Sequence, residues 1–329
     1  MNEVLNIDWQ PLGLLIKPSL SHPKWLRHYT GASSIVEGPR AGLFWCYITG
    51  RDDKNRSLIG RILVDLEGKA SVIDIAHRPC LSHGSLGSFD EDGVSYPCVV
   101  SDGEVLHLFY TGWVATCSTG FQNHLGRAIS HDGGQNFIRI SRAPVMHRTD
   151  DEPFSIGSTF VTLEGRKWRM WYTSFIEWYR KTDSVSAGHR YLIRYAESED
   201  GERWHRDYVD RIGFGPEEHS VCHPSVLKLE DTFHMWFCAR GEYYRIFHAV
   251  SRDGLTWHRL PYRLSRDVLG DWDHDSQCYP SAFEHKGFVY VVYSGNEYGK
   301  GGLGMVMTSS ENLKSAANRF WEKGHAVAY

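Results

Sequence analysis

The amino-acid sequence predicts an all-β protein, a five-bladed β-propeller with about four antiparallel strands in each blade. Three observations predict this fold: an aromatic strand pattern that recurs five times, a hairpin motif that recurs three times, and the lack of a competing long helical pattern. Aromatic and β-branched residues favour strands, and matched units at a fixed spacing indicate a repeat architecture. A β-sandwich is the alternative, but it would not explain five matched units.

The hairpin motif is clearest at residues 251–259, which read Ser-Arg-Asp-Gly-Leu-Thr-Trp-His-Arg. Residues 198–206 repeat it as Ser-Glu-Asp-Gly-Glu-Arg-Trp-His-Arg, and residues 130–137 give a shorter version that ends in Phe. An Asp-Gly pair between extended runs predicts a tight turn in which both central residues take positive φ. The Trp or Phe that follows supplies an apolar face to anchor the turn.

Five pairs of strands define five repeating units. The first strands are predicted at residues 33–36, 96–99, 158–161, 223–226 and 279–282, and the second strands at residues 43–47, 106–110, 168–172, 233–237 and 288–293. Residues 1–329 then form a single propeller domain with blades at roughly 31–80, 90–141, 151–210, 217–262 and 273–310. We expect the N-terminal segment to complete the last blade and close the ring, which leaves only short sheet edges. One short helix is expected at residues 310–320.

Composition excludes several classes of protein. The formal net charge is −4, with acidic and basic residues mixed along the chain, so a nucleic-acid partner is not expected. No apolar run approaches the roughly 20 residues that span a membrane. The seven cysteines form no Cys-x-x-Cys pair, and the first ten residues lack the features of a signal peptide. These features predict reduced thiols and a cytoplasmic location.

Carboxylates recur at matching positions before the first strands, which makes them candidates for catalysis. The acids at these positions are Asp90, Asp151, Glu217 and Asp273, followed by Glu91, Asp92, Glu152, Glu218 and Asp275. Loops that enter the first strands form one face of a propeller, so we expect these acids to meet at one mouth of the channel. Clustered carboxylates raise one another's pKa, so that one can hold a proton near neutral pH.

Chemistry at a glycosidic carbon needs one carboxylic acid and one carboxylate. We therefore predict Asp92, Glu152, Glu218 and Asp275 as the candidate acid, base and nucleophile. A solvated loop acid or a turn cap is the alternative interpretation for each.

Basic and aromatic side chains in the neighbouring loops are predicted to bind substrate. His219 and His223 flank Cys222 before a strand, which fits a substrate-binding or proton-relay role. A divalent metal held by these histidines is an interpretation that we do not favour, so no cofactor is predicted. Arg240 is suited to bidentate contact with a carboxylate or phosphate, or to a structural ion pair with Glu242. The predicted substrate-binding residues are His219, His223, Arg240, Arg245, Trp113, Trp178 and Tyr279.

Several motifs together resemble a known group of proteins. They are Ser-x-Asp-Gly-x-x-Trp-x-Arg at Ser198 and Ser251, His223-Pro224-Ser225-Val226, and Tyr279-Pro280-Ser281 followed by Tyr293-Ser294-Gly295-Asn296. From about Ser33 to Ser310 the chain resembles the five-bladed β-propeller glycoside hydrolase superfamily of families 32, 43, 68, 117 and 130. It looks most like uncharacterised propeller proteins encoded in bacterial polysaccharide gene clusters. The resemblance implies a site at the channel mouth and a carbohydrate ligand.

The catalytic acids of that superfamily are not all matched in this sequence. Families 32 and 43 carry an Asp on the inner strand of the first blade, a second Asp in the next blade and a Glu in the third. Here the first blade has no acid at residues 29–33, the second has Tyr96-Pro97, and Glu152 lies early for the third. The family's triad therefore does not carry over intact.

Three functions remain open. The first is a glycoside hydrolase-like enzyme that acts at a glycosidic or glycosyl centre, which predicts two carboxyls roughly 5–10 Å apart. The second is a cytoplasmic enzyme that modifies a nucleotide-linked or lipid-linked sugar in surface-polysaccharide biosynthesis, which predicts a basic phosphate pocket. The third is a non-catalytic glycan-binding propeller, which predicts aromatic side chains without perturbed acids.

Overall fold

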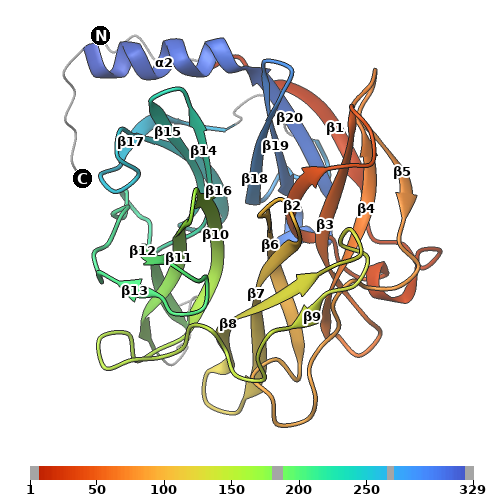
Figure 1. Cartoon of the computed structure of the whole chain (residues 1–329). Coiled ribbons are helices and arrows are strands. Elements are labelled where there is room, and N and C mark those ends of the chain that lie inside the picture. The colour runs from red at the N-terminus through yellow and green to blue at the C-terminus, as the bar shows by residue number, and fades with distance from the viewer. Residues whose placement is uncertain (1–6, 180–187, 265–269, 323–329) are drawn as a thin grey trace.

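The protein, described by a computed structural model over residues 7–179, 188–264 and 270–322, consists mainly of antiparallel strands (Figure 1). The strands form five consecutive four-stranded units. They are β2 (Gly31–Glu37), β3 (Leu43–Arg51), β4 (Ser57–Asp65) and β5 (Ser71–Ile75); β6 (Gly93–Ser101), β7 (Leu106–Thr116), β8 (Gly120–Ser130) and β9 (Ile138–Arg139); β10 (Ile156–Glu164), β11 (Lys167–Trp178), β12 (His189–Ser198) and β13 (His205–Arg206); β14 (Ser220–Leu229), β15 (Thr232–Arg240), β16 (Tyr244–Ser251) and β17 (His258–Arg263); and β18 (Cys278–His285), β19 (Phe288–Ser294) and β20 (Leu303–Ser309) with β1 (Gln10–Ile16). The helices of the described residues are η1 (Lys24–Leu26), α1 (Asn296–Gly299) and α2 (Ser310–Glu322).

The N-terminal strand completes the last unit, as the sequence predicts. β1 pairs antiparallel with β20, so the sheet order is β1-β20-β19-β18. The first two units share a single parallel pair, between Ser57 and Gly93, and therefore count as one eight-stranded sheet. Strands from the two ends of the described chain thus lie in one sheet.

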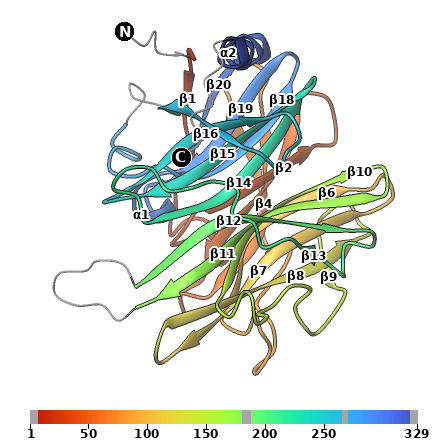
Figure 2. The same ribbon diagram turned by 90° about the vertical axis from the view of Figure 1, so that its left-hand side faces the viewer.

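The first strands of the five units stand around a common centre. β2 contacts β6 and β18, β6 contacts β10, β10 contacts β14, and β14 contacts β18. Figures 1 and 2 show the sheets arranged around this centre. The first strands therefore place short stretches of all five units side by side.

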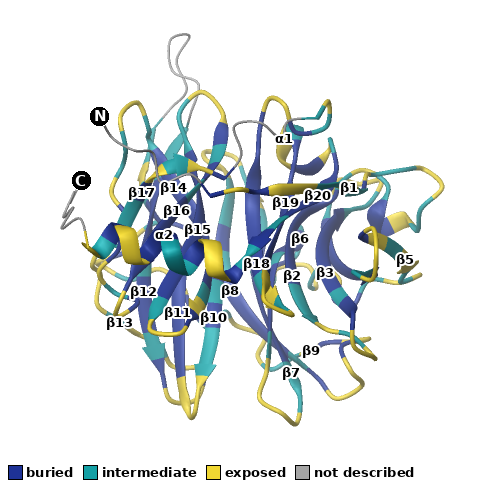
Figure 3. Ribbon diagram, turned by 90° about the horizontal axis from the view of Figure 1, so that it is seen from above, coloured by how far each residue is buried: buried dark blue, intermediate teal, exposed yellow. Residues whose placement is uncertain are grey.

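The second strands are apolar on both faces because each sheet packs between two neighbouring sheets. In β15 every residue from Phe233 to Ala239 is buried. Trp236 belongs to one apolar cluster, whereas Phe237 belongs to another on the opposite face of the sheet. Burial of one large apolar side chain contributes about 1.5–3 kcal/mol. Figure 3 shows that exposure is concentrated in the connecting loops.

The hairpin motif forms a wider loop than the predicted two-residue turn. Only its glycines take positive φ, at 71° for Gly201 and 74° for Gly254, whereas Asp253 does not. Asp253 Oδ1 instead accepts hydrogen bonds from the backbone N–H groups of Leu255 and Thr256, at 2.8 and 2.7 Å. Burial opposes ionisation, but these hydrogen bonds lower the pKa of Asp253 to about 2. The prediction of positive φ at both residues is wrong because the Asp side chain organises the loop itself.

Each hairpin loop also joins its unit to the preceding one. Arg61 of β4 donates to Gly133 O, Arg127 of β8 to Asp200 O, and Arg169 of β11 to Asp253 O, each at 2.7 Å. Hydrogen bonds to charged donors are among the stronger ones in proteins. The repeated motif therefore stabilises contacts between units as well as its own turn.

Replacing Asp253 by Ala is expected to lower the free energy of unfolding by about 2 kcal/mol, because several hydrogen-bond donors lose their acceptor. Among them is the Ser251 hydroxyl, which donates to Asp253 Oδ1 at 2.8 Å and is fully buried. Urea denaturation measures the change. Asp150→Ala is a suitable control, because Asp150 is exposed and has no partner in the described part of the chain. Equal stability of the two variants would contradict the assigned role of the motif.

The predicted helix at residues 310–320 is present as α2 and extends two residues further. Its buried residues include Leu313, Ala316 and Phe320, which follow the i, i+3, i+7 spacing of a helix with one apolar face. Phe320 belongs to a small apolar cluster with Leu260 of the fourth unit. The helix therefore covers the outer strands of that unit.

Two further predictions concern the membrane and the cysteines. Within the described residues, no helix combines the length and the apolar character needed to cross a membrane. All seven cysteines are unpaired, and only Cys117 is exposed.

Candidate functional site

A cavity of about 450 Å³ opens where the first strands begin. Its walls combine residues near the start of the first strands with residues from the ends of the second strands and the loops beyond them. The lining residues are Tyr29, Arg51, Asn55, Ser95, Tyr96, Trp113, Gly120, Phe121, Asn123, Gly157, Ser158, Thr173, Phe175, His189, Tyr191, Cys222, Arg240, Tyr244, Tyr279 and Tyr298. All five units contribute, so the cavity exists only in the assembled fold.

Three strained residues lie at the base of this cavity. Each first strand has a register shift near its start, and in three units the shifted segment contains a bulky residue directly before a proline. These residues are Tyr96, His223 and Tyr279, with φ values of 53°, 52° and 58°. The left-handed conformation costs a non-glycine residue roughly 1–2 kcal/mol. A β-bulge changes the direction in which side chains point, and residues with a strained backbone conformation are concentrated at functional sites.

The side chains of Tyr96, His223 and Tyr279 meet one another. The Tyr96 hydroxyl donates to the Tyr279 hydroxyl at 3.3 Å, and the three ring centroids lie 5.2–5.6 Å apart. Burial lowers the pKa of His223 to about 3 and raises the pKa of Tyr96 to about 12. At neutral pH the three rings are therefore uncharged. We call them the floor triad.

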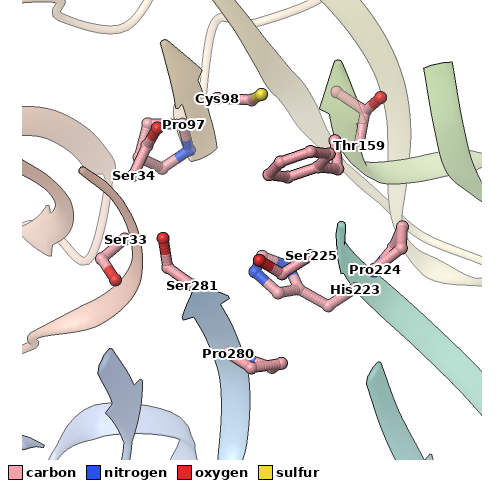
Figure 4. A pocket seen from close by; sticks show the side chains of 11 residues that line it. Ser33, Ser34, Pro97, Cys98, Thr159, His223, Pro224, Ser225, Pro280 and Ser281 are labelled. Carbon is pink, nitrogen blue, oxygen red and sulfur yellow. The ribbon is translucent and has the colours of Figure 1, made fainter. Parts of the chain in front are cut away.

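A second, much smaller cavity lies on the other side of the floor triad. Its volume is about 10 Å³, and Figure 4 shows the side chains around it, among them Ser33, Ser225, Ser281 and His223. A space of this size suits about one water molecule. The lining residues directly follow those of the large cavity along the first strands, so the two cavities share an axis.

The walls of the large cavity are mainly aromatic. Phe121 packs edge-on against Phe175, with centroids 6.1 Å apart, and Tyr244 packs edge-on against Tyr298 at 5.8 Å. Burial raises the pKa of Tyr244 well above its usual value, so its hydroxyl keeps its proton. Such walls offer apolar ring faces together with neutral hydrogen-bonding groups.

Three of the seven predicted substrate-binding residues line the large cavity, namely Trp113, Arg240 and Tyr279. His223 lines only the small axial cavity. Trp113 is held in place by a hydrogen bond from Nε1 to Ser57 Oγ at 2.7 Å. Arg240 has no ion pair with Glu242, or with any other residue that the structure describes, so the structural alternative for Arg240 is not realised.

The other three predicted substrate-binding residues, His219, Arg245 and Trp178, are not among the lining residues of either cavity. His219 contacts Gly241 O through Nε2 at 3.1 Å, and burial lowers its pKa. Arg245 donates to the backbone oxygen of Asp275. Trp178 stacks on Phe175 with centroids 5.4 Å apart. Local packing partners keep these three side chains out of the cavity wall.

The four predicted catalytic carboxylates do not meet in the cavity. No Asp or Glu occurs among the described residues that line it. Glu152 is 2% exposed and accepts hydrogen bonds from Tyr172 at 3.0 Å, from Arg194 at 3.2 Å and from Arg206 at 2.8 Å. Glu218 accepts from both arms of Arg259, each at 2.7 Å.

Asp92 and Asp275 also lie outside the cavity wall. Asp92 Oδ2 accepts a hydrogen bond from the backbone N–H of Ala115 at 2.7 Å. Asp275 is exposed and contacts His274, with 2.7 Å between Nδ1 and Oδ1. The expectation that the four acids gather around one cavity therefore finds no support: none is among the described lining residues, and each has a separate local partner.

The alignment of the acids has a structural cause. In three consecutive units an acid before the first strand pairs with the arginine at or near the end of the hairpin motif. These repeated acid–arginine pairs are Asp90–Arg139, Glu152–Arg206 and Glu218–Arg259, at 2.7, 2.8 and 2.7 Å. The pairs tie the innermost loop of each unit to its outermost strand. Acids at two adjacent aligned positions, Asp90 at the first and Glu152 and Glu218 at the second, therefore join strands within their units, although the sequence alone was equally compatible with a catalytic cluster.

Metal binding receives no support from the side-chain geometry. Over residues 7–179, 188–264 and 270–322, no group of three or more His, Cys, Asp or Glu side chains is arranged to hold a metal ion. His219 and His223, the pair considered from the sequence, lie in different surroundings, one beside Gly241 and one in the floor triad.

Sequence reasoning missed much of the cavity wall. The residues that were not identified include Tyr29, Arg51, Tyr96, Tyr244 and Tyr298. A signal for Tyr96 was present, because Tyr-Pro at residues 96–97 and 279–280 matches His-Pro at 223–224. Aligned bulky residues before proline mark the bulges that form the floor triad.

Comparison with solved structures identifies the fold. The fold is that of the propeller glycoside hydrolases. One solved glycoside hydrolase has a TM-score of 0.67 at 13% identity, over 92% of this protein and 91% of that one. A glycosyl hydrolase from Bacteroides ovatus has a TM-score of 0.66 at 12% identity, over 93% and 94%. A structure from work on the family-130 mannoside phosphorylases has a TM-score of 0.67 at 12% identity, over 94% and 96%.

Sequence comparison places the protein more narrowly. It belongs to the same family as "Uncharacterized protein Rv1502" and "Uncharacterized protein MT1551" from two strains of Mycobacterium tuberculosis. Each is 38% identical to it over 301 residues, which cover 91% of this sequence and 98% of the relative. No protein-family model matches the sequence.

Proposed function

We propose that the protein is carbohydrate-active and that it binds a glycan in the large central cavity. The observation that carries the proposal is the composition of the cavity wall: aromatic faces from several units, neutral tyrosine hydroxyls and two arginines enclose about 450 Å³. Concave sites with apolar walls and a few convergent polar groups are typical ligand sites. The fold shared with propeller glycoside hydrolases supports a sugar as the ligand.

Recognition of the glycan is the function that the geometry supports best. Hydrolysis by two cavity carboxylates would need acids in the wall, and the described wall has none. Hydrolysis remains the second candidate, favoured by the likeness of the fold to glycoside hydrolases. Asp92 is its best-placed acid, because its backbone N–H donates to the carbonyl oxygen of the lining residue Trp113 at 3.2 Å.

We also infer that the five four-stranded units are the blades of one closed propeller. Their boundaries would fall near residues 31–80, 90–141, 151–210, 217–262 and 273–310. The cyclic contacts between the first strands and the pairing of β1 with β20 support this inference. A cytoplasmic location is supported by the seven unpaired cysteines.

The proposed function is tested by titrating the protein with a panel of neutral and acidic mono- and oligosaccharides, followed by calorimetry and tryptophan fluorescence. Trp113→Ala is expected to weaken binding about fivefold, because a stacked aromatic contact is worth roughly 1 kcal/mol. Phe288→Ala is the matched control, since Phe288 is 40% exposed and does not line the cavity.

The outcomes separate the candidate functions. Saturable binding that depends on Trp113 supports glycan recognition, and turnover of the same sugar that is abolished by Asp92→Asn supports the hydrolase. Binding unaffected by Trp113→Ala places the ligand elsewhere and contradicts the proposal.

A further inference from the structure

We propose that the glycan bound in the central cavity carries an anionic group, a carboxylate or a phosphate, and that Arg51 and Arg240 bind it. This inference rests on the proposed function and names the chemical class of its ligand. It follows from the arginines of the wall and from the lack of Asp and Glu among the described residues that line it.

Arg51 is held with its guanidinium at the cavity wall. Its Nη1 donates to the backbone oxygen and the Oδ1 of Asn55, at 2.9 and 3.1 Å. Its guanidinium carbon lies 5.2 Å from the ring centroid of Tyr29 and 5.6 Å from that of Trp113. Neutral partners thus orient the cation and leave other N–H groups for a ligand.

Arg240 lies at the end of β15, in a different unit from Arg51. Its guanidinium carbon is 5.3 Å from the ring centroid of Tyr244, another lining residue. Among the residues that the structure describes, its side chain makes no ion pair and no hydrogen bond. Within residues 7–179, 188–264 and 270–322, no carboxylate therefore neutralises its positive charge.

Among the described residues that line the cavity, the two arginines have no carboxylate beside them, although the chain is rich in acids. The chain has 40 acidic residues against 36 lysines and arginines, so acids are not scarce. Elsewhere Arg139, Arg206 and Arg259 each have a carboxylate within 2.8 Å. The described cavity wall has two arginines and no Asp or Glu.

Both arginines are half-buried, and moving a cation partly out of water is unfavourable unless an anion compensates it. A guanidinium presents parallel N–H groups that match the oxygens of a carboxylate or a phosphate. Aromatic faces for a sugar ring and guanidinium groups for an acid occur in the same wall. An acidic sugar, either a uronic acid or a sugar phosphate, satisfies both.

The test compares three probes with one sugar skeleton: D-glucose, D-glucuronate and D-glucose 6-phosphate, with inorganic phosphate as a fourth. Binding is measured by calorimetry and by the fluorescence of the protein. We expect at least one acidic sugar to bind tenfold or more tightly than glucose, and Arg51→Gln and Arg240→Gln each to remove most of that preference. Arg51→Lys keeps the positive charge but loses the paired N–H donors of the guanidinium, so this variant should retain part of the preference for the acidic sugar. Arg142→Gln is the control, because Arg142 is exposed and does not line the cavity.

The results distinguish this inference from the proposed function. If glucose binds and neither acid binds more tightly, the inference is overturned while the proposed function stands. If phosphate binds in an arginine-dependent way and no sugar does, the anion site stands and the proposed function fails. If no probe binds, both are contradicted. The affinity for glucuronate compared with that for glucose 6-phosphate decides whether the site prefers a carboxylate or a phosphate. Circular dichroism and the melting temperature show that each variant is folded, and a variant that is not folded is replaced by Arg51→Lys or Arg240→Lys.

Discussion

Glu152→Gln is expected to lower the free energy of unfolding by about 3 kcal/mol, because it removes one partner of a buried ion pair and leaves the other. Arg206 and Arg194 both contact the Glu152 carboxylate, and Arg206 is itself only 8% exposed at the side chain. Tyr172 donates to the same carboxylate, and its hydroxyl keeps its proton because burial, followed by the charge of Glu152, raises its pKa. Glutamine offers one acceptor oxygen where three donors converge.

Urea denaturation measures this loss, and the melting temperature should fall by roughly 4 °C. Glu199→Gln is the matched control, because Glu199 is exposed in the same unit and has no partner among the described residues. Glycan binding below the melting transition should be unchanged in both variants. A Glu152→Gln protein as stable as the wild type, but unable to bind or process the glycan, would restore Glu152 to the functional site.

A second large effect is expected on acidification. Burial lowers the pKa of His223 to about 3 and that of His234 to about 4, and it lowers the pKa of His248 well below the usual value. The unfolded chain takes up protons near pH 6.5, whereas the folded protein does not. Stability from these three groups is therefore complete above about pH 6.5 and is lost as pH falls toward the folded pKa values.

The magnitude follows from the proton linkage. As the pH falls below 6.5, each histidine that stays neutral in the folded state lowers the free energy of unfolding by about 1.4 kcal/mol per pH unit, so three together give about 4 kcal/mol per pH unit. A protein of ordinary stability should then unfold between about pH 4 and 5. Urea denaturation at a series of pH values measures the slope.

The buried pair of His234 and His248 supplies the control variant. His234 Nδ1 lies 3.0 Å from His248 Nε2, and both rings stack near Trp236. His234→Gln keeps a hydrogen-bonding group but cannot titrate, so the slope should fall by about 1.4 kcal/mol per pH unit. His131→Gln, at an exposed position, should leave the slope unchanged. A wild-type protein whose stability is flat from pH 6.5 to 4.5 would contradict the prediction.

The strands were predictable from the sequence because their signals are local. Residues 233–237 and 288–293 are runs of apolar and aromatic side chains, and they are found in β15 and β19. The hairpin motif was recognised correctly as a repeat, but its turn geometry depends on the Asp253 side chain rather than on backbone preference alone. The pairing of β1 with β20 followed from the need to cover a sheet edge.

The site was predictable only in part because it depends on contacts between distant segments. Trp113, Arg240 and Tyr279 were identified, since each follows a pattern in its own unit. Arg51 was missed because its placement depends on Tyr29, Asn55 and Trp113, and no motif records that combination.

The acids were placed in the wrong surroundings for a different reason. The recurrence of the acids before the first strands was recognised. It does not show, however, whether an arginine of the same unit pairs with the carboxylate. For Glu152 and Glu218 it does, through Arg206 and Arg259.

The floor triad has a consequence for the shape of any glycan that the cavity accepts. Beyond Tyr96, His223 and Tyr279 lies the small cavity of about 10 Å³, which has room for about one water molecule. A space of this size does not admit a sugar ring. If the protein binds a glycan in the large cavity as proposed, the floor triad would favour the terminal residue of a glycan, or a short free molecule, over the middle of a long strand.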